Sequence, residues 1–337
     1  MGKFKGRHKF PAQNACIYCG SVSYEESSGR QLGDEHTIPE AVGGIFVLPN
    51  AACRNCETTI NSAEMALYRG GFLSVRKHFG FKGKKRASKH QKHTVPIFDC
   101  SVEGETKRIE IPASEYPGIL LLCVPPPPKL INPNWQPIGD IWSHWVNATS
   151  LQTVNDELPS VAVKHGLRSF ALASTDSLAH ARALAKIAHS NAIGLLGREF
   201  FSPLLIDFIL GRENSRCYEL FGRSLISASI EMQAHAVRFR EVVSNGTRYL
   251  VAEVRLFACL NSPSFDLVTG IVKPNQKLLN NAEVTQGAPP GFDMIIGPDQ
   301  SFDPRTHKLL RGLPKVSATG IELTDPSQWF RVRIDFQ

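Results

Sequence analysis

Hydrophobic residues recur at helical spacing in several parts of the chain. After Ser177, which is placed to cap a helix, apolar positions three and four residues apart continue to the stop signal Gly197. A similar pattern runs from Glu57 through Arg69, and the apolar run PLLIDFILG predicts a helix that begins at Pro203. We expect the helix that follows Ser177 to face the core.

Other segments carry the signals of strands. The runs KRIEIPA and GILLLCV favour strands, whereas the stretch PPPPKLINPNWQP has too few backbone donors for a helix or a central strand. Two β-rich runs meet at Asn245-Gly246, the pair that best tolerates the positive φ angles of a type I′ hairpin turn. The sequence therefore predicts an α+β fold, and we find no internal repeat.

The 337 residues exceed what one small core needs, so we expect two domains. Residues 1–94 would form a small module that ends in the basic linker GFKGKKRASKHQKH, and residues 95–337 would form a larger mixed α/β domain of unknown function.

The positive charge is concentrated at the N-terminal end. Residues 1–93 contain 15 of the 38 Lys and Arg but only 7 of the 31 Asp and Glu. Such an excess is typical of a module that neutralises phosphates of a nucleic acid. A basic tail that only aids solubility is the alternative.

Hydropathy gives no sign of a membrane protein. No window approaches the roughly 18 consecutive apolar residues of a membrane span, and the basic start lacks the apolar core of a signal peptide. We therefore expect a cytoplasmic protein with no membrane partner.

Four of the eight cysteines stand in two close pairs, Cys16-x2-Cys19 and Cys53-x2-Cys56. Without a secretion signal, this spacing favours metal binding over disulfides. Four thiolates would close the coordination sphere of a structural Zn²⁺, although ribbons and fingers without catalytic activity share this pattern. We expect the remaining cysteines to be small buried hydrophobes; these are Cys100, Cys123, Cys217 and Cys259.

Between and beside the cysteine pairs lie GDEHTIPEAVGG and LPNAAC. From Cys16 to about Glu64, the order of these elements resembles the HNH, or ββα-metal, endonuclease family, particularly its zinc-knuckle members. That resemblance implies a small zinc-stapled ββα-metal (HNH) module that hydrolyses DNA.

The resemblance also implies roles for individual residues. His36 would be the general base, Glu35 a ligand of a catalytic Mg²⁺ or Mn²⁺, and Asn50 the residue that orients the histidine. Glu57 stands where the family usually has a final His or Asn ligand, a departure that carboxylate chemistry tolerates. For Asn50, a turn or cap position after Pro49 is the alternative.

Elementary chemistry is consistent with these roles. Phosphodiester hydrolysis needs a deprotonated water and stabilised charge on the phosphate and the leaving alkoxide, which one cation and one imidazole can supply. Adjacent strand residues point to opposite faces, so Glu35 and His36 meet at one ion only if the backbone bends. The segment Thr37–Pro39 and the pair Gly43-Gly44 are consistent with such a bend.

Further polar and basic residues follow on the expected helix. Asn61 and Glu64 share a face with Glu57 and could replace it as ligand or orient it; a solvated polar face is the alternative for both, and the more favoured one for Asn61. We expect a group of basic residues to hold flanking phosphates without reading sequence: Arg69, Arg76, Lys77, Lys82, Lys84, Lys85 and Arg86.

The sequence assigns no activity to residues 95–337. The isolated His180, His189 and His235 are typical of structural histidines. This region could recognise nucleic acid, bind a protein partner or mediate homo-oligomerisation.

Together these features predict a DNA endonuclease, in phage defence or mobile-element biology. The alternatives are a zinc-knuckle protein that binds nucleic acid without catalysis, and an HNH nuclease that acts on RNA.

Overall fold

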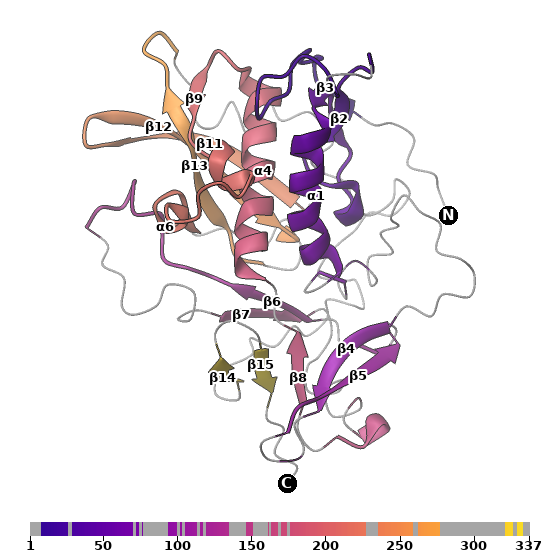
Figure 1. The fold of residues 1–337 in the computed structure, drawn as a ribbon. Coiled ribbons are helices and arrows are strands. Elements are labelled where there is room, and N and C mark those ends of the chain that lie inside the picture. The colour runs from indigo at the N-terminus through magenta and orange to yellow at the C-terminus, as the bar shows by residue number, and fades with distance from the viewer. Residues whose placement is uncertain are drawn as a thin grey trace, which may run out of the picture.

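The computed structural model describes part of the chain, and its described residues are 8–25, 29–69, 72–73, 76, 94–99, 102, 105–112, 115–116, 119–134, 146–150, 161, 163–167, 170–173, 176–226, 235–258, 262–276, 321–325 and 329–332. Within these ranges the protein is a mixed α+β structure in which two long helices lie side by side (Figure 1). No helix among them is both long and apolar enough to cross a membrane.

The N-terminal part is a strand hairpin followed by a helix. Strand β2 (Gly33–His36) pairs antiparallel with β3 (Phe46–Ala52), and β1 (His8–Lys9) adds to β3 in parallel. A 3₁₀ turn (Glu40–Val42) lies in the hairpin loop, and α1 (Arg54–Arg69) follows β3 directly. The predicted helix from Glu57 is thus confirmed, and it begins three residues earlier.

The bent loop between β2 and β3 depends on its two glycines. Gly43 has a φ of 93°, in the left-handed region that glycine adopts without strain. A Cβ on Gly44 would lie 1.8 Å from the backbone oxygen of Ile38, so no larger residue fits there without a backbone shift. The bend predicted from this glycine pair is therefore present.

The larger sheet has the strand order β10-β13-β12-β11, with β9 paired to β13. At one edge of this sheet, β11 and β12 form the hairpin predicted at Asn245-Gly246, whose φ angles are 47° and 74°. The strands and short helices of this part are β9 (Phe201–Pro203), α5 (Ile206–Ile209), α6 (Cys217–Leu220), β10 (Phe221–Arg223), β11 (His235–Ser244), β12 (Thr247–Leu256) and β13 (Phe265–Val272).

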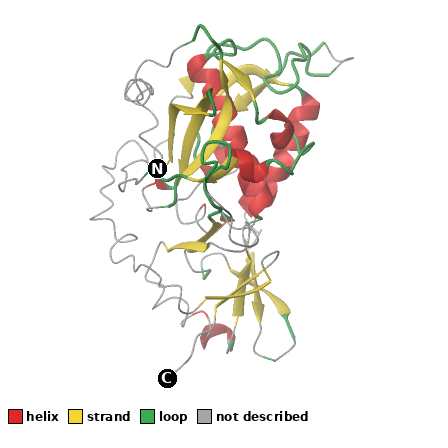
Figure 2. Ribbon diagram, turned by 90° about the vertical axis from the view of Figure 1, so that its left-hand side faces the viewer, coloured by secondary structure: helices red, strands yellow, loops and turns green. Residues whose placement is uncertain are grey.

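Two further sheets lie below the helices in Figure 1, and Figure 2 shows the same separation from the side. One has the order β14-β15-β8-β4-β5, and the other pairs β6 with β7. The predicted strands KRIEIPA and GILLLCV correspond to β5 and β6, while residues 125–134 of the proline stretch form no helix or strand. The strands are β4 (Thr94–Asp99), β5 (Lys107–Pro112), β6 (Ile119–Cys123), β7 (Val146–Ser150), β8 (Phe170–Ala173), β14 (Ile321–Asp325) and β15 (Trp329–Val332).

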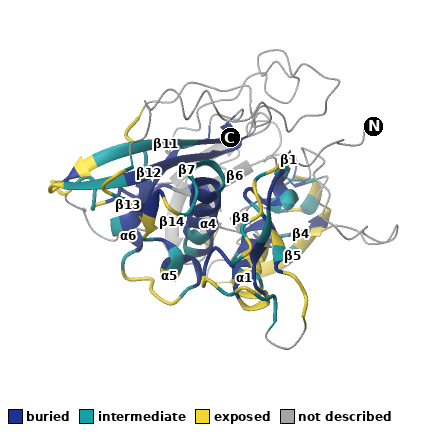
Figure 3. Ribbon diagram, turned by 90° about the horizontal axis from the view of Figure 1, so that it is seen from above, coloured by how far each residue is buried: buried dark blue, intermediate teal, exposed yellow. Residues whose placement is uncertain are grey.

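The helix predicted after Ser177 is α4 (Ser177–Leu196), and it ends before Gly197 as expected. Its cap is different, because the Asp176 side chain accepts a hydrogen bond of 2.8 Å from the Ala179 backbone N–H. Most of the helix is buried on all sides, since α1 packs on one side and β11–β13 on the other (Figure 3).

The predicted helix at PLLIDFILG is largely wrong. Pro203 ends strand β9, whose residues pair with the edge of β13, and only Ile206–Ile209 are helical. Proline fits this position because an edge strand tolerates the missing backbone donor.

One buried cluster unites residues of the N-terminal module with residues of α4 and of the larger sheet. It contains Leu48 and Leu67 from the module together with Leu184 from α4 and Val254 from β12. The N-terminal module therefore shares its core with the rest of the chain. The division at residue 94 stays a prediction.

Candidate functional site

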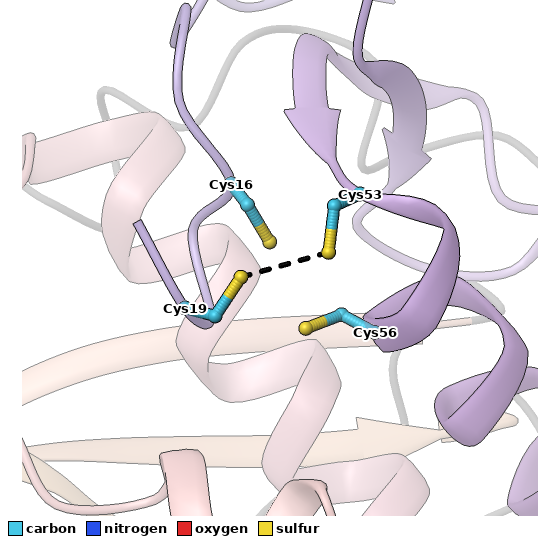
Figure 4. Close-up of side chains that lie close together, drawn as sticks. All are labelled: Cys16, Cys19, Cys53 and Cys56. Atoms are coloured by element: carbon cyan, nitrogen blue, oxygen red, sulfur yellow. Dashed lines mark hydrogen bonds between the residues drawn. The ribbon is translucent and has the colours of Figure 1, made fainter. Parts of the chain in front are cut away.

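The four paired cysteines lie together where a loop meets the start of a helix. Cys16 and Cys19 come from the loop before β2, and Cys53 and Cys56 from the start of α1, with their side chains pointing toward one another (Figure 4). Their sulfur atoms all lie within 4.8 Å of one another, and Cys19 Sγ is 3.5 Å from Cys53 Sγ. All four are free thiols, so the group could hold a metal ion such as zinc.

The electrostatics of this cluster favour a bound cation. A hydrogen bond from the Cys56 thiol lowers the pKa of Cys16 to about 4, although burial opposes the shift. The same contact and burial raise the pKa of Cys56. Two thiolates at this distance repel one another, and a divalent cation between them removes that repulsion.

Close to the start of α1 the surface opens into a pocket of about 410 Å³. Its lining residues come from the loop before β2, from β2 and β3, and from the first turns of α1. They are Arg30, Gln31, Leu32, Gly33, Asp34, His36, Asn50 and Glu57. Three of the predicted site residues, His36, Asn50 and Glu57, thus face one cavity.

Strand alternation decides which acidic neighbour accompanies His36. Asp34 and His36 are two residues apart on β2 and both line the pocket, whereas Glu35 between them is buried on the opposite side. The acid-His motif predicted Glu35 at this site and did not indicate Asp34. The two-residue period of the strand was the signal that would have selected Asp34.

Glu35 lies instead in a buried ion pair with α4. Its Oε1 atom is 2.6 Å from Nζ of Lys186, and the side chain is 9% exposed. Burial raises the pKa of the Glu35 carboxyl, and the ammonium of Lys186 opposes that shift. The structure therefore does not bring Glu35 into the pocket with His36.

Asn50 lies at an irregularity of the hairpin. The β2–β3 register shifts between Gly33 and Glu35, so that β3 contains extra residues opposite β2. Asn50 has a φ of 52° there, and its backbone N–H donates to Oδ1 of Asp34 at 3.4 Å. Asparagine tolerates this left-handed conformation better than most residues, so its backbone role alone explains the residue type.

Glu57 and Arg30 are linked through one tyrosine. The Tyr24 hydroxyl donates to Glu57 Oε2 at 2.8 Å, and the Arg30 guanidinium stands 4.1 Å from the centre of the Tyr24 ring. The hydrogen bond to Glu57 raises the pKa of Tyr24. Sequence reasoning did not find Tyr24 or Arg30, because isolated Tyr and Arg residues carry no recognisable spacing.

The other residues considered on α1 lie outside the pocket. Asn61 is exposed, and Glu64 is buried with its Oε1 atom 3.2 Å from Nζ of Lys186. Neither lines the pocket with Glu57, although the three are spaced along one helix face. The positions of Asn61 and Glu64 therefore do not support a role for either residue as a metal ligand in the pocket.

The expected phosphate-binding residues are only partly described. Arg76 is half-buried, and its guanidinium donates to the backbone oxygens of Ala41 at 2.6 Å and Tyr68 at 2.9 Å. Arg76 therefore ties the end of the helical region to the hairpin loop. The described parts do not include the Arg69 side chain or the residues Lys77, Lys82, Lys84, Lys85 and Arg86.

The three histidines expected to be structural are all buried. Burial lowers the pKa of His180 to about 3 and those of His189 and His235 to about 4. His235 accepts a hydrogen bond from the Phe257 N–H at 3.1 Å and donates to the Val42 oxygen at 2.8 Å, which fixes a neutral ring. Of the scattered cysteines, Cys217 is buried as expected, and the side chains of the other three lie outside the described parts.

The imidazole nitrogen and carboxylate oxygen atoms that could bind a metal ion in the pocket lie farther apart than the four cysteine sulfur atoms. Among the described residues, the four cysteines form the one group of three or more His, Cys, Asp or Glu residues whose ligand atoms all lie within 4.8 Å. No protein-family model, curated protein or solved structure matches the chain.

Proposed function

We propose that the chain is a metal-dependent endonuclease that hydrolyses DNA, with His36 as its general base and a structural zinc ion at the four cysteines. The observation that carries this proposal is the pocket itself, which joins an imidazole, two carboxylates and an arginine. A module that only binds nucleic acid needs basic and aromatic groups and has no use for such a set.

His36 is suited to accept a proton from an attacking water. An imidazole ordinarily titrates near neutral pH, and the His36 side chain remains 13% exposed at the pocket. Glu40 stands beside it, with its Oε2 atom 4.0 Å from His36 Nε2, and favours the protonated imidazole that forms during the reaction.

Asp34 and Glu57 offer the oxygen donors that a hard divalent cation prefers. Mg²⁺ retains several waters and takes one or two carboxylates from a protein, so an open pocket with two carboxylates suits it better than a closed cluster would. Once bound, Mg²⁺ or Mn²⁺ would stabilise negative charge on the scissile phosphate and the leaving oxygen.

Arg30 is the pocket residue best suited to hold the phosphate. Its guanidinium presents several N–H donors in one plane, the geometry that matches two phosphate oxygens. Stacking on the Tyr24 ring restricts its orientation, and the same tyrosine holds Glu57. Tyr24 thus connects two residues that line the pocket, Arg30 and Glu57.

The proposal is tested with zinc-loaded protein, supercoiled plasmid DNA and a single-stranded RNA of mixed sequence. With Mg²⁺ or Mn²⁺ we expect nicking of the plasmid, and we expect His36→Ala to slow it on the order of 10²- to 10⁴-fold. His165→Ala is the matched control, because His165 pairs with Glu115 and lies outside the pocket.

Equal plasmid cleavage by wild type and His36→Ala would remove His36 from the mechanism. Cleavage of the RNA alone would make RNA the substrate of the same pocket. Tight DNA binding without cleavage under every metal condition would favour the zinc-knuckle binding protein.

A further inference from the structure

Helix α4 contacts the backbone directly behind the pocket. The Lys186 ammonium donates to the backbone oxygen of His36. One turn further, the Ser190 hydroxyl donates to the Lys186 backbone oxygen at 2.8 Å and also lies 3.3 Å from the backbone oxygen of Thr37. His189 on the same helix donates to the backbone oxygen of Ile17 at 3.0 Å, beside Cys16. The helix thus holds both the strand that carries His36 and the loop that carries the first cysteine pair.

Lys186 is the charged centre of this contact. Its Nζ atom lies 2.6 Å from Glu35 Oε1 and 3.2 Å from Glu64 Oε1, and the three side chains are 2%, 9% and 11% exposed. An ammonium has three N–H donors, and Glu35, Glu64 and the His36 carbonyl supply three acceptors. Lys186 therefore forms ion pairs with both carboxylates and a hydrogen bond with the backbone of β2.

This arrangement fixes His36 from the side opposite its imidazole. Glu35 points from β2 toward Lys186, the His36 carbonyl accepts from the same ammonium, and the imidazole faces the pocket. Because Lys186 holds both the carbonyl of His36 and the side chain of the preceding residue, the direction of the His36 side chain is restricted. A general base must hold its geometry to well under an ångström to act efficiently.

We propose that Lys186 is a positioning residue for His36, through which the C-terminal part of the chain sets the geometry of the pocket. This inference rests on the proposed function, because it takes His36 to be the general base. It also assigns a role to the helix that the sequence left without one.

The competing explanation is that Lys186 forms a purely structural ion pair. A variant that removes Lys186 but keeps the net charge of the cluster distinguishes the two explanations. Lys186→Met alone leaves two carboxylates facing each other without a counter-charge and would destabilise the fold for that reason. The double variant Lys186→Met/Glu64→Gln keeps the cluster at the wild-type net charge but lacks the contact with the His36 carbonyl. Glu64→Gln alone is the matched control, since it keeps that contact.

The test measures steady-state cleavage and peptide-level hydrogen exchange on the full chain. For Lys186→Met/Glu64→Gln we expect kcat to fall on the order of 10²-fold while KM stays within about threefold. We also expect faster exchange in residues 33–38 and unchanged exchange in β11–β13. Glu64→Gln and the surface control Lys273→Met, which breaks an exposed pair with Glu199, should match wild type in both measurements.

Wild-type kcat in the double variant would overturn the proposal, and so would unchanged exchange in residues 33–38. A loss of kcat shared equally by Glu64→Gln would also overturn it, because the carboxylate rather than the ammonium would then be responsible. If the wild-type protein cleaves neither DNA nor RNA, the proposed function fails. The exchange measurement then still decides whether Lys186 holds the strand of His36.

Discussion

At the scale of single residues, the direction of each side chain on β2 decides the composition of the site. The sequence placed Cys16, Cys19, Cys53 and Cys56 together, and the structure gathers them. It also placed His36, Asn50 and Glu57 in one site, and all three line the pocket.

Glu35 is the residue that sequence reasoning misplaced. A change of one position along a strand moves a side chain to the other face, so the acid directly before His36 points away from it and the acid two positions before shares its face. Its partner Lys186 comes from a helix far along the chain, so the ion pair is not visible in the local sequence.

Asp34 and Glu35 are therefore expected to respond differently to loss of charge. Asp34→Asn removes a carboxylate from the pocket and should raise the Mg²⁺ concentration for half-maximal cleavage by roughly tenfold or more. Glu35→Gln removes a partner of Lys186 and should mainly lower the midpoint of thermal unfolding. The measurement is a Mg²⁺ titration of the cleavage rate for both variants, beside their melting curves. A larger change in Mg²⁺ requirement for Glu35→Gln would contradict the assignment of Asp34.

At the scale of elements, the start of α1 is held by the cysteine cluster. The cluster connects the loop before β2 to the helix that carries Glu57, so a metal ion there fixes two sides of the pocket relative to each other.

We expect about one zinc ion per chain in the purified protein and its loss in Cys53→Ser. Without the ion, the loop and helix lose their connection, and the midpoint of thermal unfolding should fall. Zinc is measured by elemental mass spectrometry. Cys217→Ser is the control, because Cys217 is buried but outside the cluster, and it should retain the metal. Full zinc content in Cys53→Ser would disprove the four-thiolate site.

The elements with strong local signals were predictable. Helix α4 and the Asn245-Gly246 hairpin follow from apolar periodicity and from backbone conformations that few residues adopt. The segment around Pro203 was not predictable, because its pairing with β13 is a tertiary contact that overrides an apolar run compatible with either structure. The N-cap at Asp176 rather than Ser177 shows that adjacent capping residues cannot be separated by sequence alone.

At the scale of the whole molecule, one buried cluster includes the N-terminal module, α4 and the larger sheet. Length and composition suggested separate domains. They indicate how large a hydrophobic core a chain can form, but not whether its segments share one core. The three buried histidines lie where these parts meet, and two of them bond backbone oxygens of the module.

These histidines should make the stability of the fold depend on pH. In the unfolded chain they bind protons below about pH 6.5, whereas in the folded chain their pKa values are about 3 to 4. The unfolded state therefore binds more protons between these limits, and the free energy of unfolding falls as the pH is lowered. When the pH is lowered from 7 to 5, each histidine should reduce the free energy of unfolding by about 2 kcal/mol.

Urea unfolding of wild type and His180→Leu at pH 7 and pH 5 measures this effect. His180 is the suitable site, because burial alone lowers its pKa and its ring packs against the rings of Phe72, Phe221 and Phe265. The variant should lose less stability than wild type over the same interval. An equal loss in both proteins would show that His180 is not a buried neutral residue.

The most direct test of the proposed active site is the position of a divalent cation in crystals grown with Mn²⁺ and measured at the manganese absorption edge. We predict an anomalous peak in the pocket, in contact with Asp34 or Glu57 and near His36, distinct from a zinc peak among the four cysteines. A manganese peak between Glu35 and Glu64 in place of the Lys186 ammonium, or no peak in the pocket at millimolar Mn²⁺, would contradict this account.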